Sequence, residues 1–276
     1  MSAGAPVVPA AALARRRRAL LRAHRVRTAR DALRFIDALG FCYAFTAGPG
    51  GLPGLFDVLA TRSVDRMWTW AWRWKDELAT RRRVYYGKAI RRKPSYVSLP
   101  LLPAFYALSG NLGEPDDHLQ AYREGRLSLQ AREIYERILE AGPASTWTLR
   151  RAFLARGERG SRFHRALDEL QERFLIAKVR EEDEWRYGFV WDVFHRWMPG
   201  VVATAANLSA DVAAGQVLAA YLGIVGAARA EDVRALFGWS PALLARAAAG
   251  AGAAEATVAG RRGLTLPAAW EEFQRY

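Results

Sequence analysis

The chain has 276 residues, of which 51% are hydrophobic and 12% aromatic, so it can bury a sizeable core and is not an intrinsically disordered protein. Cys42 is the only cysteine and the four histidines are scattered, which excludes a disulfide scaffold and a cysteine-ligated zinc site. Lys and Arg number 41 against 28 Asp and Glu, and the net charge of +13 favours a polyanionic partner. We expect no metal and no cofactor.

The excess positive charge is concentrated in the first part of the chain. Residues 1–126 hold 22 Lys and Arg against 10 Asp and Glu, a net charge of +12, whereas residues 127–276 hold 19 against 18. Nucleic acid is the commonest partner of such a field, and an acidic membrane surface comes second. We expect phosphate contacts from three cationic clusters: Arg15, Arg16, Arg17 and Arg18; Arg81, Arg82 and Arg83; and Lys88, Arg91, Arg92 and Lys93.

The N-terminal part begins with residues 1–10, which are small and apolar with two prolines and are expected to form a disordered tail. Residues 11–39 have helical periodicity, which Gly40 and then GPGGLPG (48–54) interrupt. Ser63 is a candidate N-cap for a helix over 66–80, although the alternating tryptophans of MWTWAWRW also suit a strand. The prolines of residues 93–108 predict an extended segment. Together, residues 11–110 are interpreted as a basic, winged-helix-like domain.

Two more modules follow the polar boundary GNLGEPDD (110–117). Helices are expected over 127–140, 145–156 and 161–174, followed by two strands around the charged tip REEDE (180–184). Three helices and a hairpin in this order are typical of a winged helix, here over residues 125–198. The order recurs in a smaller module over 208–276, with helices over 210–225, 230–237 and 240–249 and a hairpin over 256–266. The predicted fold is mainly α with small β-hairpins (α+β), built of tandem winged-helix modules.

Several segments resemble one enzyme superfamily. The runs GPASTWTLRRAF, RFHRALDELQERFLIAKV and AAYLGIVGAARAEDVRALFGWS resemble the AlkZ/YcaQ-type crosslink-repair DNA glycosylases. The run VYYGKAIRRKPSYVSLPLLPAFYALSGN is closest to the AlkZ-related branch of that superfamily. The resemblance implies winged-helix modules that hold duplex DNA in a basic channel. For the enzymes it also implies metal-independent excision of alkylated or crosslinked purines.

The chain departs from this family at the catalytic motif. Family glycosylases carry Gln-x-Gln or Gln-x-Asp just after a Leu-Gly pair, where the polar side chains position water at the anomeric carbon. Here Leu39-Gly40 is followed by FCYAF, so the matching positions are Tyr43 and Phe45. Phe45 cannot accept a proton, and a phenol with a pKa of about 10, as at Tyr43, is a poor base at neutral pH.

Other residues offer alternative chemistry. Asp76 and Glu77 are candidate catalytic carboxylates because an acid beside several tryptophans can have a raised pKa. Trp70 and Trp72 are candidates for stacking on an extruded base. The alternative is structural: tryptophans at helical spacing usually lie in a core, and charged neighbours usually lie on a wet helix face.

The helix over 161–174 occupies the place of a recognition helix. Arg159, Arg162 and Arg165 lie near its start and are candidate DNA contacts. Asp168, Glu169 and Glu172 follow at once, and acids there would be repelled by phosphate. We therefore expect residues 15–30 and 81–93 to contribute most of the affinity for DNA.

Three functions fit these patterns. The first is a DNA-repair protein that binds double-stranded DNA, damaged or distorted, nonspecifically or by its structure, without the usual catalytic motif. The second is an active glycosylase that uses another carboxylate, and the third is a winged-helix transcriptional regulator. The N-terminus has its apolar run before its charges, the reverse of a secretory signal, and no stretch reaches the roughly 18 apolar residues of a membrane span. We expect a cytoplasmic, nucleoid-associated monomer.

Overall fold

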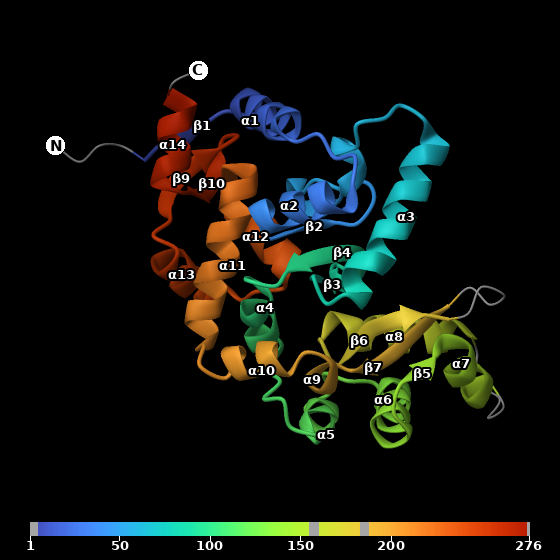
Figure 1. The fold of residues 1–276 in the computed structure, drawn as a ribbon. Coiled ribbons are helices and arrows are strands. Elements are labelled where there is room, and N and C mark those ends of the chain that lie inside the picture. The colour runs from blue at the N-terminus through green and yellow to red at the C-terminus, as the bar shows by residue number, and fades with distance from the viewer. Residues whose placement is uncertain (1–4, 155–159, 183–187, 275–276) are drawn as a thin grey trace.

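The computed structural model describes residues 5–154, 160–182 and 188–274 (Figure 1). Within these residues helices dominate, and the strands form three small sheets. The predicted fold class, mainly α with small β-hairpins, is confirmed.

The N-terminal module, residues 5–110, arranges helices around an antiparallel sheet of order β2–β4–β3. Its elements are α1 (Ala10–Ala23), α2 (Ala29–Leu39), β2 (Phe41–Tyr43), the 3-10 turns η1 (Pro49–Gly51) and η2 (Leu55–Val58), α3 (Val64–Thr80), β3 (Val84–Ile90), β4 (Lys93–Ser98) and α4 (Leu102–Ser109). The helical pattern of residues 11–39 is divided because Thr28 and Asp31 form a capping box that starts α2.

Two sequence predictions for this module can be compared with the structure at helices α3 and α4. The tryptophan-rich segment is helical, with Ser63 accepting a hydrogen bond from the backbone N–H of Arg66. The prediction of an extended segment is confirmed over Lys93–Ser98 but wrong over Leu102–Ser109, which is α4. Pro103 lies in the first turn of α4, where a backbone N–H has no helical partner, so the missing donor carries no penalty.

The segment predicted to form the first winged helix, residues 125–198 (the first winged-helix module), has its own hydrophobic core. It contains α6 (Leu129–Ala141), β5 (Ala144–Ser145), α7 (Thr146–Leu154), α8 (Gly160–Glu172), β6 (Ile176–Glu181), β7 (Phe189–Val193) and α9 (Phe194–Trp197). The strands form a sheet of order β5–β7–β6. Phe163, Leu167 and Leu170, from the predicted apolar stripe of α8, are buried. Helix α5 (Asp117–Arg123) precedes the module.

The second winged-helix module, residues 208–274, repeats this order of elements. After α10 (Pro199–Ala205) come α11 (Ala210–Val225), β8 (Ala227–Arg229), α12 (Ala230–Phe237), α13 (Pro241–Gly250), β9 (Ala254–Val258), β10 (Arg261–Thr265) and α14 (Pro267–Gln274). The predicted disordered tail is wrong at β1 (Val7–Val8), which pairs in parallel with β9. Val8 is fully buried, and its apolar contacts explain why this segment is ordered.

The modules differ in how their hydrophobic cores are connected. Phe41 of the N-terminal module lies in the same hydrophobic cluster as Leu218 and Leu222 of α11. The N-terminal and second winged-helix modules therefore share a core. The first winged-helix module lies below the β3–β4 hairpin and α3 in Figure 1, and it contributes Phe174 and Phe194 to the same cluster in addition to its own core. The division into three domains remains an interpretation of the sequence.

No single helix within the described residues is long and apolar enough to cross a membrane. Helices α10 and α11 satisfy that test only together, and the chain bends by 110° between them.

Candidate functional site

Helix α8 is docked on the β3–β4 hairpin through its acidic side. The Lys88 ammonium lies 2.6 Å from an Asp168 carboxylate oxygen, and Arg92 Nε lies 3.0 Å from Glu172 Oε2. Glu169 accepts hydrogen bonds of 2.9 and 2.7 Å from the backbone N–H and hydroxyl of Ser128. Each of the three acids that follow the cationic start of α8 therefore has a partner inside the protein.

Neutral hydrogen bonds complete this junction. The Tyr85 hydroxyl donates to the carbonyl oxygen of Gln171 at 2.9 Å, and the backbone N–H of Lys88 donates to Gln171 Oε1 at 3.2 Å. Gln171 and the Tyr85 side chain are both buried. Since this side of α8 is covered by the hairpin, it is closed to a DNA groove.

A charged cluster joins α3 to β6. Lys75 and Asp76 come from α3, and Lys178 and Glu181 come from β6. Asp76 Oδ1 contacts both ammonium groups, Lys178 also contacts Glu181, and Lys75 Nζ lies 3.4 Å from Glu181 Oε1. The lysine side chains are 0% exposed, whereas those of Asp76 and Glu181 are 20% and 32% exposed. The carboxylates thus face partly outward, with two buried cations behind them.

Burial and the neighbouring charges shift the pKa values of the two carboxyl groups in this cluster. Burial favours a higher pKa for Asp76, but hydrogen bonds from Glu181, Lys178 and Lys75 outweigh burial and lower it. Burial and the hydrogen bond to Asp76 raise the pKa of Glu181. Glu181 is therefore the less readily ionised of the two carboxyl groups. Asp76 is an ionised carboxylate held by cations, and this is the opposite of the raised pKa expected for a general base.

Aromatic rings cover the two lysines and also line a cavity. Lys75 Nζ lies 4.1 Å from the ring centroid of Trp72 and 4.9 Å from that of Phe189, and Lys178 Nζ lies 4.0 Å from that of Phe189. Trp72 and Phe189, with Tyr86 and Trp191, line a cavity of about 280 Å³ between the N-terminal module and the first winged-helix module. Its polar lining includes Lys88, His164 and Asp168.

The two positions predicted to match the glycosylase motif, Tyr43 and Phe45, differ in their surroundings. Tyr43 is buried, and its hydroxyl lies 3.3 Å from the carbonyl oxygen of Pro49. Burial raises the pKa of Tyr43 to about 12, so even less of the basic phenolate form is present at neutral pH. Phe45 is half-buried and stacks on Trp72, with ring centroids 6.0 Å apart and planes at 20°.

The comparisons with known proteins agree with this fold. A model of the AlkZ-related family matches residues 26–238. The chain belongs to the AlkZ-related family. Among solved structures, the AlkZ-related chain is similar to the Streptomyces sahachiroi DNA glycosylase AlkZ, at 17% identity and a TM-score of 0.58. The match covers 95% of this chain and 71% of that one. At this identity it shows a shared fold. No curated protein matches the chain.

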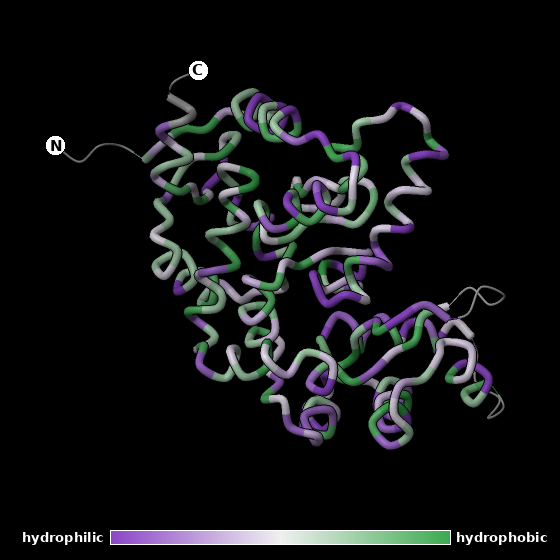
Figure 2. Tube along the Cα trace, viewed as in Figure 1, coloured by the Kyte–Doolittle hydropathy of each residue, from purple (hydrophilic) through white to green (hydrophobic). Residues whose placement is uncertain are grey.

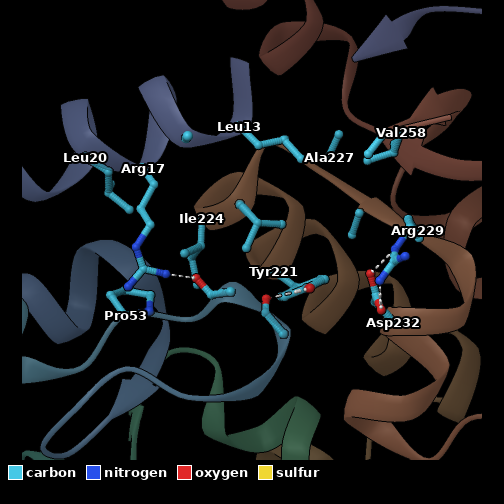
Figure 3. A pocket seen from close by; sticks show the side chains of 16 residues that line it. Leu13, Arg17, Leu20, Pro53, Tyr221, Ile224, Ala227, Arg229, Asp232 and Val258 are labelled. Carbon is cyan, nitrogen blue, oxygen red and sulfur yellow. Dashed lines mark hydrogen bonds and ion pairs between the residues drawn. The ribbon is translucent and has the colours of Figure 1, made fainter. Parts of the chain in front are cut away.

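The AlkZ-related chain uses part of its first cationic cluster internally. Arg16 donates to the carbonyl oxygen of Gly223 at 2.8 Å. Arg17 donates to that of Gly51 at 2.8 Å (Figure 3). Arg17 also pairs with Asp57 at 3.0 Å. The cavity of about 520 Å³ beside Arg17 contains further satisfied groups, including the Arg229–Asp232 ion pair (Figure 3). Arg15 and Arg18 are exposed and form no ion pair within the described residues. These turns of α1 are hydrophilic in Figure 2.

The other predicted cations of this AlkZ-related protein are similarly divided. Arg81 pairs with Glu77 at 3.0 Å, and the Arg82 guanidinium lies 3.9 Å from the ring centroid of Trp197. The remaining predicted DNA-contact residues that the structure describes, apart from Lys88 and Arg92, are exposed: Arg83, Arg91, Lys93, Arg162 and Arg165. Arg159 lies outside the described residues.

The predicted stacking residues separate in the AlkZ-related structure. Trp72 lines the cavity, whereas Trp70 stacks on Trp74 with centroids 5.4 Å apart.

Lys178 and Glu181 were not predicted, and one signal for Lys178 was available: a lysine inside the apolar strand LIAKV needs a buried partner. Across the described residues, no group of three or more His, Cys, Asp or Glu could hold a metal ion.

Proposed function

We propose that this chain binds duplex DNA through phosphate contacts, selecting the structure of the DNA and not its sequence, and that it acts in DNA repair without excising bases. The observation that carries the proposal is the docking of α8 on the β3–β4 hairpin through the Lys88–Asp168 and Arg92–Glu172 pairs. The covered side of α8 cannot read base edges, and only its start, with Arg162 and Arg165, stays exposed, so we expect phosphate contacts to supply most of the affinity.

Exposed cations without an internal ion pair are available for those contacts. On α1 and just beyond it, Arg15, Arg18, Arg22 and Arg25 are exposed, and none forms an ion pair in the part of the chain that the structure describes. Arg91 and Lys93 are exposed at the turn between β3 and β4. Each phosphate neutralised releases condensed counterions, so affinity for DNA should fall steeply with salt.

Binding without base excision is supported by the chemistry of the candidate residues. Tyr43 is a buried phenol, Phe45 has no proton acceptor, and Asp76 is held by two lysines. None of them therefore offers an accessible polar side chain, free of internal partners, to position or activate water at an anomeric carbon.

Two measurements on one set of duplexes test the proposal. Fluorescence anisotropy against salt should give a slope that becomes shallower by about two when Arg15 and Arg18 are both changed to Glu, since each lost phosphate contact removes about 0.9. The matched variant Arg162→Glu with Arg165→Glu, on α8, should change the slope less. A larger effect of the α8 pair would support a recognition-helix model instead.

The second measurement addresses catalysis directly. A base-release assay on duplexes with N7-alkylated guanine should show no abasic sites beyond the uncatalysed rate. Formation of abasic sites would establish an active glycosylase, and Asp76→Asn would then test the remaining candidate carboxylate. A preference for one palindromic sequence would favour a transcriptional regulator.

A further inference from the structure

A partly exposed aromatic surface surrounds the position of the missing glycosylase motif. We define it as Phe45, Phe56, Trp68 and Trp72. The Phe45 ring centroid lies 5.7 Å from that of Phe56, 5.3 Å from that of Trp68 and 6.0 Å from that of Trp72. Trp68 is 45% exposed, a large fraction for a tryptophan in a folded protein. Phe45 therefore replaces a polar catalytic side chain with the centre of an apolar platform.

This surface continues into the cavity at the module junction. Trp72 belongs to both, and the cavity adds the rings of Tyr86, Phe189 and Trp191. Its volume of about 280 Å³ lies just below the range of drug-sized ligand sites, about 300–1,000 Å³. The site is thus shaped for one flat, apolar group of modest size.

Contacts with neighbouring residues hold the aromatic walls of the cavity in place. The charged cluster places Lys75 against Trp72 and Phe189, and the Trp191 indole N–H donates to Thr146 Oγ1 at 2.9 Å. On the other side, the Lys88–Asp168 pair presents a donor and an acceptor to the cavity. A site whose rings are already held in place loses little conformational entropy when a ligand binds.

Positively charged side chains lie on the elements that form the cavity. Arg73, next to Trp72 in the sequence, is exposed on α3, and Lys93 is exposed at the hairpin. Arg91 and Arg92 form the turn of the hairpin with φ of 50° and 55°, a left-handed conformation that usually favours Asn and Gly. Such strain persists where the surroundings enforce it, and Glu172 holds Arg92 here, while Arg91 stays exposed.

We propose that the aromatic surface and this cavity bind one unpaired nucleobase of a DNA strand, while the neighbouring cations hold the phosphates on either side of it. This inference rests on the proposed DNA binding and adds the DNA structure that is selected. Stacking on aromatic rings suits any base, and cations spaced along a strand suit its backbone. An apolar peptide would match the rings but would leave the cations without partners.

The selected DNA is therefore a duplex that exposes an unpaired base, such as a one-nucleotide bulge. No bond is made or broken in this recognition. The preference follows from one stacking interaction, which is available to the bulged base and unavailable to a base inside a regular duplex.

The experiment compares a duplex that carries one bulged 2-aminopurine with the same duplex fully paired. Anisotropy gives both affinities, and 2-aminopurine fluorescence reports stacking. The wild-type chain should bind the bulged duplex about tenfold more tightly, the size of one base-stacking contact, and should quench its fluorescence. Trp72→Ala should abolish both effects while keeping affinity for the paired duplex.

Two further variants keep the test decisive. Trp68→Ala alters an exposed ring, so it should fold normally and reduce the preference severalfold. Trp147→Ala, on α7, removes a tryptophan that is 40% exposed with Arg151 5.3 Å from its ring centroid, and it should change nothing. Equal binding of both duplexes by the wild type, or a preference that survives Trp72→Ala and Trp68→Ala, would overturn this inference and leave the proposed DNA binding intact. Failure to bind either duplex would overturn both.

Discussion

Changing Asp76 to Asn tests whether the charged cluster is a structural junction or a catalytic site. The substitution keeps the size of the side chain and removes its charge. Lys75 and Lys178, whose side chains are 0% exposed, would then share Glu181 as their only carboxylate within the described residues. Burial and the hydrogen bond to Asp76 raise the pKa of Glu181 in the wild type, so Glu181 is the less readily ionised of the two carboxyl groups.

The expected loss of stability is large. Removing one partner of a buried ion pair costs about 3–5 kcal/mol because an uncompensated charge stays buried. Asp76 is 20% exposed, so water recovers part of that penalty and we expect about 3 kcal/mol. For a chain of this size, 1 kcal/mol corresponds to about 2–4 °C, so the melting temperature should fall by about 6–12 °C.

Urea unfolding followed by circular dichroism, together with calorimetry, measures this loss. Glu77→Gln is the matched control: Glu77 is the next residue in α3, and its ion pair with Arg81 is a surface pair, worth at most about 1 kcal/mol. Adding Lys178→Met to Asp76→Asn should recover stability, because it removes one of the two buried charges. An Asp76→Asn chain as stable as the wild type would refute the structural interpretation, and loss of base release in that stable variant would establish catalysis.

Three other perturbations have defined outcomes. Exchanging the charges of the junction tests the docking of α8: Lys88→Asp should cost about 1 kcal/mol in urea unfolding, and adding Asp168→Lys should restore it, whereas additive losses would contradict the pairing. Gly54→Ala should destabilise the chain by about 3 kcal/mol, since its Cβ would lie 2.0 Å from the carbonyl oxygen of Phe45, and a neutral effect would show that this loop is not closely packed. Burial lowers the pKa of His24 and of His195, and Arg196 lowers that of His195 further. The two neutral histidines therefore contribute their full stability above the unfolded-state pKa of about 6.5. This contribution is lost as the pH falls through the lower folded-state pKa values. The free energy of unfolding should therefore decrease from pH 7 to pH 5, and a His24→Gln, His195→Gln double variant with an unchanged decrease would assign it to other groups.

The order of elements was predictable because it follows from local patterns. The apolar stripe from Phe163 to Leu170 and the serine caps at Ser63 and Ser240 each act within one or two helical turns. These signals located α8, α3 and α13. Helix α4 was missed because its prolines were interpreted as breakers, although a proline in the first turn is compatible with a helix.

The candidate site was less predictable because its partners are distant in the sequence. Asp76 meets Lys178 across 102 residues, and Lys88 meets Asp168 across 80. Periodicity identifies the face on which a side chain lies, but it does not identify which other module covers that face. The acids of α8 therefore suggested repulsion of phosphate, whereas their partners are Lys88, Arg92 and Ser128 within the same chain.

The docking of α8 on the hairpin and the aromatic surface are structurally connected. An α8 docked on the hairpin has its position fixed relative to α3, so that Trp72 of α3 and His164 of α8 line one cavity. The ion pairs that remove Lys88 and Arg92 from DNA contact also hold the walls of that cavity. Phe45 extends the same apolar surface outward to Trp68. If Phe45 occupies the second polar position of the glycosylase motif, as the sequence predicts, the proposed absence of base excision and the proposed stacking surface both follow from this one residue.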